Sequence, residues 1–439
     1  MYRQKKILFI GDSSLLVTGY ATVIRNLLKY LEFLHPENSY SHLGWYHPMN
    51  VFNSNLLLDG DMYFNYIPVI PTEQDKIGVI TLPKVINEYK PDIVVVVNDP
   101  WFIDVVPSVI SSSTKNFFLI NYMAIDSKPM ITKYYKSVNN KGIIQDIESS
   151  LKTADMIILF TEFAKEVFLE CLPDYDKEKI KVIPHGVDPF IYYPLNKEHA
   201  IQVIYRHLGI DLSDKYVFGF VSANQPRKNI PQLIHAFSKV VNKWKHQLKE
   251  NYNKTIQCRK PFLFLYTSDT TFGWNIYELL KEYNVQNFSY VFTSGPLGTG
   301  KESSFMNVVY NAFDVLVMPS NREGWGLPAL EALATGTPII VTKWGPLYDW
   351  SKDVAIPIDT KYFTRAFGTN YLEAHVDIDD LYAKMFMMYN KYKSNKGYRD
   401  DKCIEFAHKF SWDKVADMWA EVFSQIPVKN KTNDTGLTI

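Results

Sequence analysis

The segment Met318-Pro-Ser-Asn-Arg-Glu-Gly-Trp-Gly-Leu-Pro-Ala-Leu-Glu-Ala-Leu-Ala-Thr-Gly-Thr-Pro338 decides the fold. The apolar residues that lead to Met318 predict the end of a buried strand. Residues 320–326 predict a polar loop, and residues 328–334 a short helix with a proline in its first turn. Gly336 ends that helix, and Pro338 begins another strand. A strand, a loop and a helix in this order predict a ligand at the carboxyl end of a parallel sheet.

The loop and the start of the helix have features that suit an anion next to a sugar. Free backbone N–H groups and the partial positive charge of a helix N-terminus attract an anion. Gly324 and Gly326 carry no side chains, so a ligand can approach the backbone closely. Glu323 in the loop and Glu331 in the helix are carboxylates. We expect both to face one cleft and to bind hydroxyl groups of a sugar or a ribose.

The pattern Glu323-Gly-Trp-Gly-Leu-Pro, followed by Glu331-Ala and Gly336-Thr-Pro, resembles a known family site. It is similar to the nucleotide-sugar site of the retaining GT-B glycosyltransferases, family 4 (glycosyl transferases group 1), which are related to glycogen and sucrose synthases. The resemblance implies transfer of a hexose from a UDP- or GDP-linked sugar to a glycan, lipid or protein-linked acceptor. A plain strand–loop–helix turn with two solvated glutamates is the structural alternative.

Apolar runs and amphipathic helical patterns alternate along both halves of the chain. This alternation predicts an α/β fold with two doubly wound parallel sheets, and the resemblance implies the GT-B arrangement, in which two Rossmann-like domains face a cleft and a C-terminal helix crosses back to the first domain. The predicted parts are an N-terminal acceptor-side domain (1–190), a linker (191–212), a C-terminal nucleotide-sugar-binding domain (213–409), a crossover helix (410–427) and a flexible tail (428–439).

The loop at residues 222–229 follows a predicted strand and carries two cations. Lys228 matches the lysine that similar enzymes place against a diphosphate, whereas Ala223 stands where they carry an arginine. Whether Arg227 supplies that second charge stays open, and a solvated pair of side chains is the alternative. Residues 343–349 are predicted to form a further loop beside the cleft.

The resemblance also assigns roles to the residues of the C-terminal site. Lys228 and Arg227 neutralise the diphosphate, and Glu331 binds the ribose. Glu323 holds the transferred sugar, near the N–H groups of the residues that follow it, namely Gly324, Trp325, Gly326 and Leu327. In the working picture for this family the leaving phosphate takes the acceptor proton.

Three residues of the N-terminal half are weaker candidates for the cleft. Asp126 follows a predicted strand at the place where similar enzymes carry His or Asp; it orients the acceptor or the sugar, or it is a turn residue. Gly19 stands alone in a loop where the family has two glycines. His185 either touches substrate at the cleft edge or belongs to a tight turn that shapes the interdomain hinge.

The composition narrows the class of protein. The 439 residues include 47 Lys and Arg and 47 Asp and Glu, so net charge gives no reason to expect nucleic-acid binding. Three widely spaced cysteines fit a reducing compartment. No secretory signal or membrane span is apparent, so we expect a cytoplasmic protein; peripheral membrane contact and the oligomeric state stay open.

Other functional patterns are incomplete. The segment from Gly295 to Glu302 is close to a phosphate-binding P-loop and supports a rival NTPase reading, but Glu302 replaces the hydroxyl that binds Mg²⁺. The Asp59-Gly-Asp61 segment is better explained as a turn. No metal and no cofactor are therefore predicted. A catalytically inactive sugar-nucleotide-binding protein is the main alternative function, with a GT-B epimerase or phosphorylase behind it.

Overall fold

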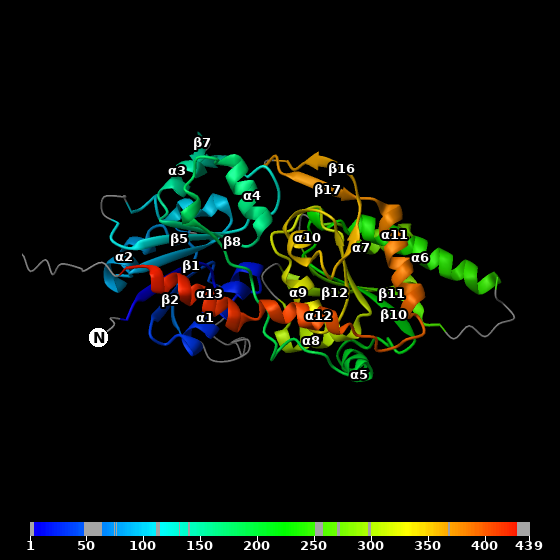
Figure 1. Ribbon diagram of the computed structural model, residues 1–439. Helices are drawn as coiled ribbons and strands as arrows, with labels where there is room; N and C mark the ends of the chain where they lie inside the picture. The colour runs from blue at the N-terminus through cyan, green and yellow to red at the C-terminus, as the bar shows by residue number, and fades with distance from the viewer. Residues whose placement is uncertain are drawn as a thin grey trace, which may run out of the picture.

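A computed structural model describes residues 4–47, 64–73, 75, 77–110, 115–130, 132–138, 141–250, 258–269, 273–296, 300–367 and 369–427. The predicted turn at Asp59–Asp61 and the predicted tail at 428–439 lie outside the described residues, as do residues 297–299 of the P-loop-like segment. Two parallel sheets with interleaved helices form the two halves of the molecule (Figure 1).

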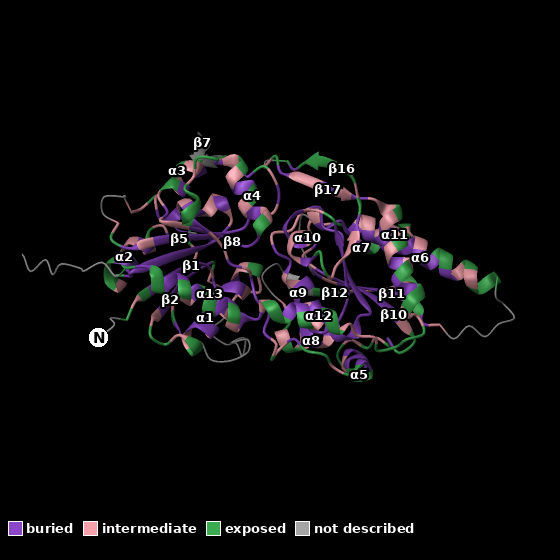
Figure 2. Cartoon of the chain, in the orientation of Figure 1, coloured by how far each residue is buried: buried purple, intermediate pink, exposed green. Residues whose placement is uncertain are grey.

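The first sheet contains seven strands in the order β3-β2-β1-β4-β5-β8-β9, and all of them are parallel. Apolar runs such as Ile93–Asn98, whose residues are all buried, form the centre of this sheet because helices cover both of its faces (Figure 2). Its strands are β1 (Lys6–Asp12), β2 (Ser39–Trp45), β3 (Asn65–Pro68), β4 (Ile93–Asn98), β5 (Phe118–Met123), β8 (Met156–Leu159) and β9 (Ile180–Val182). The helices of this half are α1 (Gly19–Leu34), α2 (Thr81–Tyr89), α3 (Ile147–Lys152) and α4 (Glu162–Cys171), with 3₁₀ turns η2 (Pro100–Val105) and η3 (Lys177–Lys179).

The second sheet contains six parallel strands in the order β12-β11-β10-β13-β14-β15. They are β10 (Lys215–Val221), β11 (Lys260–Asp269), β12 (Ser289–Pro296), β13 (Val315–Met318), β14 (Ile339–Thr342) and β15 (Ile356–Ile358). The helices are α5 (Lys197–Leu208), α6 (Ile230–Glu250), α7 (Ile276–Glu282), α8 (Ser303–Ala312), α9 (Leu327–Ala334), α10 (Gly345–Ser351), α11 (Ile378–Tyr392), α12 (Asp401–Ala407) and α13 (Trp412–Gln425), with 3₁₀ turns η4 (Pro226–Lys228), η5 (Gln286–Phe288) and η6 (His408–Phe410). None of the described helices combines the length and the apolar composition that a bilayer span requires.

One local prediction is wrong. Residues 343–349 were expected to form a loop, but helix α10 begins at Gly345. Gly345 has a positive φ of 74°, which a glycine adopts readily, and Pro346 follows in the first turn of the helix. The two residues together start a helix where the apolar pattern alone does not indicate one.

The chain crosses twice between the two halves, and the crossings lie side by side. Val187 in the first crossing forms a parallel bridge with Ser411 in the second. Gly186 fits there because a Cβ atom at this position would lie 2.6 Å from the ring of Trp412. Helix α13 then packs against α1 of the N-terminal half, where the Trp419 and Phe9 ring centroids lie 6.0 Å apart (Figure 1). The crossover helix expected from the resemblance is therefore confirmed.

Two antiparallel hairpins project from the sheets, namely β6–β7 (Lys133–Val138 and Lys141–Asp146) and β16–β17 (Thr360–Arg365 and Leu372–Val376). The second hairpin leaves the C-terminal half and reaches across to the N-terminal half (Figure 1). Its residues Ala366 and Tyr371 are buried in the apolar core of the N-terminal half. The backbone N–H of Leu372 donates to the carbonyl of Lys128 at 2.8 Å, so main-chain bonds also hold the hairpin there.

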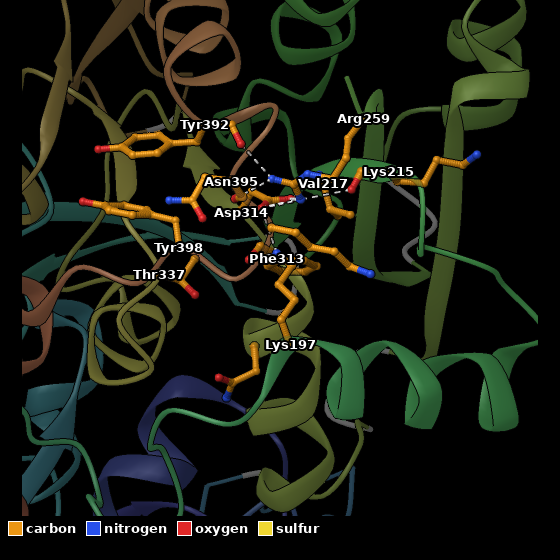
Figure 3. A network of polar contacts seen from close by, with 12 residues as sticks. Lys197, Lys215, Val217, Arg259, Phe313, Asp314, Thr337, Tyr392, Asn395 and Tyr398 are labelled. Carbon is orange, nitrogen blue, oxygen red and sulfur yellow. Dashed lines mark hydrogen bonds and ion pairs between the residues drawn. The ribbon is translucent and has the colours of Figure 1, made fainter. Parts of the chain in front are cut away.

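A buried ion network joins the linker helix to the second sheet (Figure 3). Asp314 precedes β13, and its carboxylate lies 2.9 Å from Lys197 Nζ of helix α5 and 2.8 Å from Arg259 Nη1. It also accepts a hydrogen bond from the Val217 backbone N–H at 2.7 Å. Asp314 lies at the amino end of β13, whereas the loop at residues 320–326 leaves the carboxyl end of the same strand. This network therefore supports the sheet and takes no part in the cleft.

Candidate active site

The loop between β13 and α9 occupies the carboxyl end of the second sheet, as the sequence predicts. Gly326 caps α9 with a positive φ of 86°, and a Cβ atom there would lie 3.0 Å from Leu347. Pro328 lies in the first turn of the helix. The glycine is thus required both by its backbone conformation and by the close approach of α10. In the first turn of α9, Pro328 has no N–H and the Ala329 N–H donates to the Gly326 carbonyl at 2.9 Å.

A cluster of three charges forms beside this loop. Lys228 Nζ makes an ion pair with Glu323 Oε2, and Arg227 Nη1 lies 3.4 Å from the same oxygen. The backbone N–H of Asn321 donates to the carbonyl of Arg227 at 2.7 Å, so the loop after β10 and the loop after β13 are tied together. Two cations share one carboxylate, which leaves the trio with a net positive charge.

Burial sets the protonation behaviour of this cluster. Burial lowers the pKa of Lys228 to about 8, and the neighbouring Arg227 also lowers it, while Glu323 acts in the opposite direction. Burial alone would raise the pKa of Glu323, but Lys228, Arg227 and a hydrogen bond from Ser320 outweigh it and hold that pKa below its ordinary value. Glu323 is therefore an anion near neutral pH, and Lys228 is mainly a cation.

Glu331 lies on α9 and is held by two tyrosines. The hydroxyl of Tyr310 donates to Glu331 Oε2 at 2.6 Å. Burial raises the pKa of Glu331, whereas hydrogen bonds from Tyr310 and Tyr192 lower it. Glu331 keeps partial access to solvent. Tyr192 lies in the linker segment, so this carboxylate lies on the side of the site that faces the linker.

Asp126 follows β5 and meets the C-terminal half through an arginine. Arg322 Nη1 lies 2.5 Å from Asp126 Oδ2, and Arg322 Nε lies 3.2 Å from Glu373 of hairpin β16–β17. A Cβ atom on Gly324 would lie 3.3 Å from Ala124, so the two walls touch at this point. The sequence analysis did not select Arg322 or Glu373. The position of Arg322 directly before Glu323 was an available signal, but its partners lie far away along the chain.

His185 and Trp325 are buried behind the site. The His185 ring lies 5.6 Å from that of Trp325 between ring centroids, and Trp325 stacks on Trp350 at 4.8 Å. The hydroxyl of Tyr122 lies 2.7 Å from His185 Nδ1. Burial lowers the pKa of His185 to about 3, so its ring is neutral. These rings join the Glu323 loop to the first interdomain crossing, which agrees with the reading of His185 as a hinge residue.

Gly19 is exposed at the first position of α1, and a Cβ atom there would meet nothing within 4 Å. Thr18 caps the helix through the Ala21 N–H and donates to Asp12 Oδ2 at 2.7 Å. The next residue, Tyr20, donates from its hydroxyl to Asp99 Oδ1 at 2.6 Å. Asp99 follows β4, and the sequence analysis did not select it.

The structure thus brings several of the predicted residues together and separates others. Lys228, Arg227 and Glu323 form one cluster, and Arg322 connects it to Asp126. Glu331 lies nearby on the helix that the same loop begins. His185 lies behind the loop among aromatic rings, and Gly19 lies at the carboxyl end of β1.

Comparison with known proteins finds a family match to one segment of the C-terminal half. Residues 299–354, which include the loop and α9, match the profile of glycosyl transferases group 1. The chain is 26% identical over 262 residues to a D-inositol 3-phosphate glycosyltransferase of Corynebacterium efficiens, covering 57% of this chain and 52% of that protein. It is 22% identical over 321 residues to the serotype-specific mannosyltransferase WbdA of Escherichia coli, covering 71% of this chain and 34% of that protein. The chain therefore spans about half the length, or less, of these curated relatives.

Solved structures show the same architecture over nearly the whole chain. A glycosyltransferase from Rickettsia africae has a TM-score of 0.67 at 17% identity and covers 98% of this chain and 100% of its own. Sucrose-phosphate synthase from Thermosynechococcus elongatus has a TM-score of 0.64 at 16% identity and covers 96% and 99%. The GT-B fold is thus confirmed, and so is the resemblance to glycosyl transferases group 1 that the Glu323-Gly-Trp-Gly pattern indicated.

Proposed function

We propose that this protein is a retaining glycosyltransferase of family 4 that moves a hexose from a nucleoside-diphosphate sugar to a carbohydrate-bearing acceptor. The observation that carries the proposal is the Lys228–Glu323–Arg227 cluster, with Lys228 buried and the other two partly exposed, in η4 and in the loop that leads to α9. An excess cation next to the partial positive charge of a helix N-terminus is suited to a diphosphate. Adjacent carboxylates suit the hydroxyl groups of a sugar.

The donor phosphates bind against Lys228, Arg227 and the first turn of α9. Negative charge grows on the leaving phosphate as its bond to the anomeric carbon breaks, and fixed cations in a water-poor site stabilise that charge. Because these groups are already in place, the chemistry needs no metal ion and no cofactor. Glu323 accepts hydrogen bonds from the transferred sugar, and Glu331 accepts them from the ribose.

The acceptor enters from the N-terminal half. Its hydroxyl oxygen bonds to the anomeric carbon on the face that the phosphate leaves, and the acceptor proton passes to the leaving phosphate, so the anomeric configuration is retained. Asp126 orients the acceptor or the sugar, and its ion pair with Arg322 fixes it beside the Glu323 loop.

A thermal-shift experiment with UDP, GDP, ADP and their hexose conjugates tests the proposal. A ligand at one hundred times its Kd adds about 2.7 kcal/mol to the free energy of unfolding. We expect one base to stabilise the protein more than the others, and its hexose conjugate to be hydrolysed slowly without acceptor. Stabilisation by none of them contradicts the proposal. Stabilisation without hydrolysis or transfer supports the alternative, an inactive sugar-nucleotide-binding protein.

The variant Glu331→Gln tests the ribose assignment. We expect the Kd of the preferred nucleotide to rise about tenfold or more, because a hydrogen bond to a charged group contributes about 1.5–3 kcal/mol. Calorimetric titration measures the change. Gln keeps an oxygen for the Tyr310 hydroxyl, so the local fold is conserved. Inorganic pyrophosphate is the control ligand: its Kd should stay constant, and an equal loss for both ligands would show that Glu331 does not bind the ribose.

A further inference from the structure

The N-terminal wall of the cleft has an uneven charge distribution. Asp12, Asp99 and Asp126 follow or end β1, β4 and β5, which are neighbouring parallel strands, so the three carboxylates lie at one edge of the sheet. Each is only partly exposed. Asp126 alone has an ion pair, with Arg322 of the opposite half. Among the described residues, no group of three or more His, Cys, Asp and Glu side chains is placed to hold a metal ion.

Asp99 has no ion pair among the described residues and is held by one hydrogen bond, whereas both oxygens of Asp12 accept hydrogen bonds, from Thr18 and Asn98. Asp99 begins the 3₁₀ turn η2, and its Oδ1 accepts the hydrogen bond from Tyr20 at 2.6 Å. Tyr20 follows Gly19, where the structure leaves open space around the missing side chain. Tyr20 occupies one oxygen of the carboxylate, and the remaining acceptor capacity of Asp99 is available to a ligand in the cleft.

Negative charge on Asp126 and Asp12 disfavours the charged form of Asp99. The pKa of Asp99 is raised to about 7, mainly by burial and also by the nearby Asp126 and Asp12, against the Tyr20 hydrogen bond and Arg227, which lower it. Burial also raises the pKa of Asp12, against hydrogen bonds from Thr18 and Asn98. A phosphate placed here would add repulsion from these carboxylates, whereas a neutral hydroxyl would donate a hydrogen bond.

We propose that Asp99, held by Tyr20, accepts a hydrogen bond from a hydroxyl group of the acceptor, and that the carboxylates of this wall select acceptors without a phosphate near that hydroxyl. This inference rests on the proposed transferase function and specifies the acceptor class of the same site. Arg227 and Lys228 on the opposite wall attract the donor diphosphate. The positive wall therefore binds the charged donor, and the negative wall binds the neutral acceptor. The carboxylates Asp12 and Asp126 add the repulsion, and Asp99 makes the contact.

The test compares the rates of sugar transfer to pairs of acceptors that differ only by a phosphate. The donor is the nucleotide sugar that stabilises the protein and is hydrolysed in the thermal-shift experiment described above. The pairs are glucose with glucose 6-phosphate and myo-inositol with myo-inositol 3-phosphate, together with neutral disaccharides. We expect the neutral member to have a kcat/KM at least tenfold higher. The variant Asp99→Asn should lower kcat/KM for the neutral acceptor about tenfold or more and should narrow the discrimination between the pair. Donor hydrolysis and nucleotide affinity should fall less than transfer does.

The pH profile separates a contact from a structural role. With an Asp99 pKa of about 7, kcat/KM for the neutral acceptor should fall as the pH drops below 7, because the carboxylate takes up a proton. Tyr20→Phe removes a hydrogen bond that lowers this pKa, so the acidic limb should move to higher pH. Asp99→Asn should abolish the limb. Asp176→Asn is the control, since Asp176 is an exposed residue that caps η3 away from the cleft.

Two outcomes overturn the inference while leaving the proposed function intact. One is a preference for phosphorylated acceptors, or acceptance of no neutral sugar, by a protein that binds and hydrolyses the donor. The other is an Asp99→Asn variant with unchanged acceptor kinetics, or one whose donor hydrolysis falls as much as transfer. Failure to bind any nucleotide contradicts the proposed function itself, and the thermal-shift screen detects it separately.

Discussion

The variant Lys228→Ala should lower kcat for sugar transfer by about 100- to 1,000-fold, the usual loss when one fixed donor to a developing negative charge is removed. Lys228 is buried and makes an ion pair with Glu323, in the loop that leads to α9, so no solvent cation can readily replace it. Single-turnover measurement of product formation with the preferred donor checks this expectation. An Ala variant that keeps full turnover would exclude Lys228 from the catalytic machinery.

Loss of stability must be separated from this loss of turnover. Removing Lys228 leaves the Glu323 carboxylate with Arg227 alone, and breaking a buried pair commonly costs about 3–5 kcal/mol. The double variant Lys228→Met, Glu323→Gln removes both charges and should recover most of the melting temperature without recovering turnover. If turnover returns with stability, Lys228 has a structural role only.

The pKa of Lys228 also predicts an alkaline limb in kcat/KM. Burial lowers that pKa to about 8, so the cation that binds the diphosphate is lost as the pH rises above 8. Lys228→Arg should keep part of the activity and should remove this limb, because a guanidinium stays charged throughout that range.

The variant Asp314→Ala should give the largest loss of stability away from the cleft, about 3–5 kcal/mol of the free energy of unfolding. The Asp314 side chain is 3% exposed and is paired with Lys197 at 1% and Arg259 at 8% (Figure 3). Without it two buried cations repel each other and the Val217 N–H loses its acceptor. Urea titration at pH 7 measures the change.

The destabilisation by Asp314→Ala should depend on pH. Burial lowers the pKa of Lys197 to about 7, although Asp314 opposes this shift, and an unfolded lysine keeps its proton up to about pH 10.5. Between these values the unfolded chain binds more protons, so the free energy of unfolding rises with pH. The deficit of the variant relative to the wild type should therefore be smaller at pH 9 than at pH 6. A deficit that does not depend on pH would exclude Lys197 as its source.

A matched control is the exposed pair of Asp359 and Lys343, whose atoms lie 3.4 Å apart. Asp359→Ala should change the free energy of unfolding by about 0–1 kcal/mol, because solvent screens exposed ion pairs. A loss as large as that of Asp314→Ala would show that burial does not set the difference.

Much of the fold follows from local patterns in the sequence. Runs such as Ile93–Asn98 are apolar on both sides and can only be central strands, and Gly326 with Pro328 starts a helix in the predicted place. The hairpin β16–β17 gave no such signal, because its first strand is mostly exposed and its two aromatic residues are adjacent between polar ones, so apolar and polar residues do not alternate. Its position depends on contacts with the other half, which no local pattern records.

The individual residues of the candidate site could be predicted from the sequence more readily than the contacts between them. Glu323 and Lys228 were selected because each follows a strand of the same sheet, and they do lie together. The contact between Arg322 and Asp126 joins residues 196 positions apart, and the hydrogen bond between Tyr20 and Asp99 depends on how α1 packs over the end of β4. Such contacts require three-dimensional arrangement, whereas sequence motifs identify only the loops that provide the residues.

The hairpin at 360–376 has a practical consequence for anyone who exchanges halves between related enzymes. Although its strands are encoded with the second half, Ala366 and Tyr371 complete the hydrophobic core of the first. A chimaera joined within residues 191–212 would bring a foreign Tyr371 to a surface that it did not evolve with. Grafting residues 360–376 together with the N-terminal half keeps this packing native, and such hybrids should yield more folded protein than those made with a single junction.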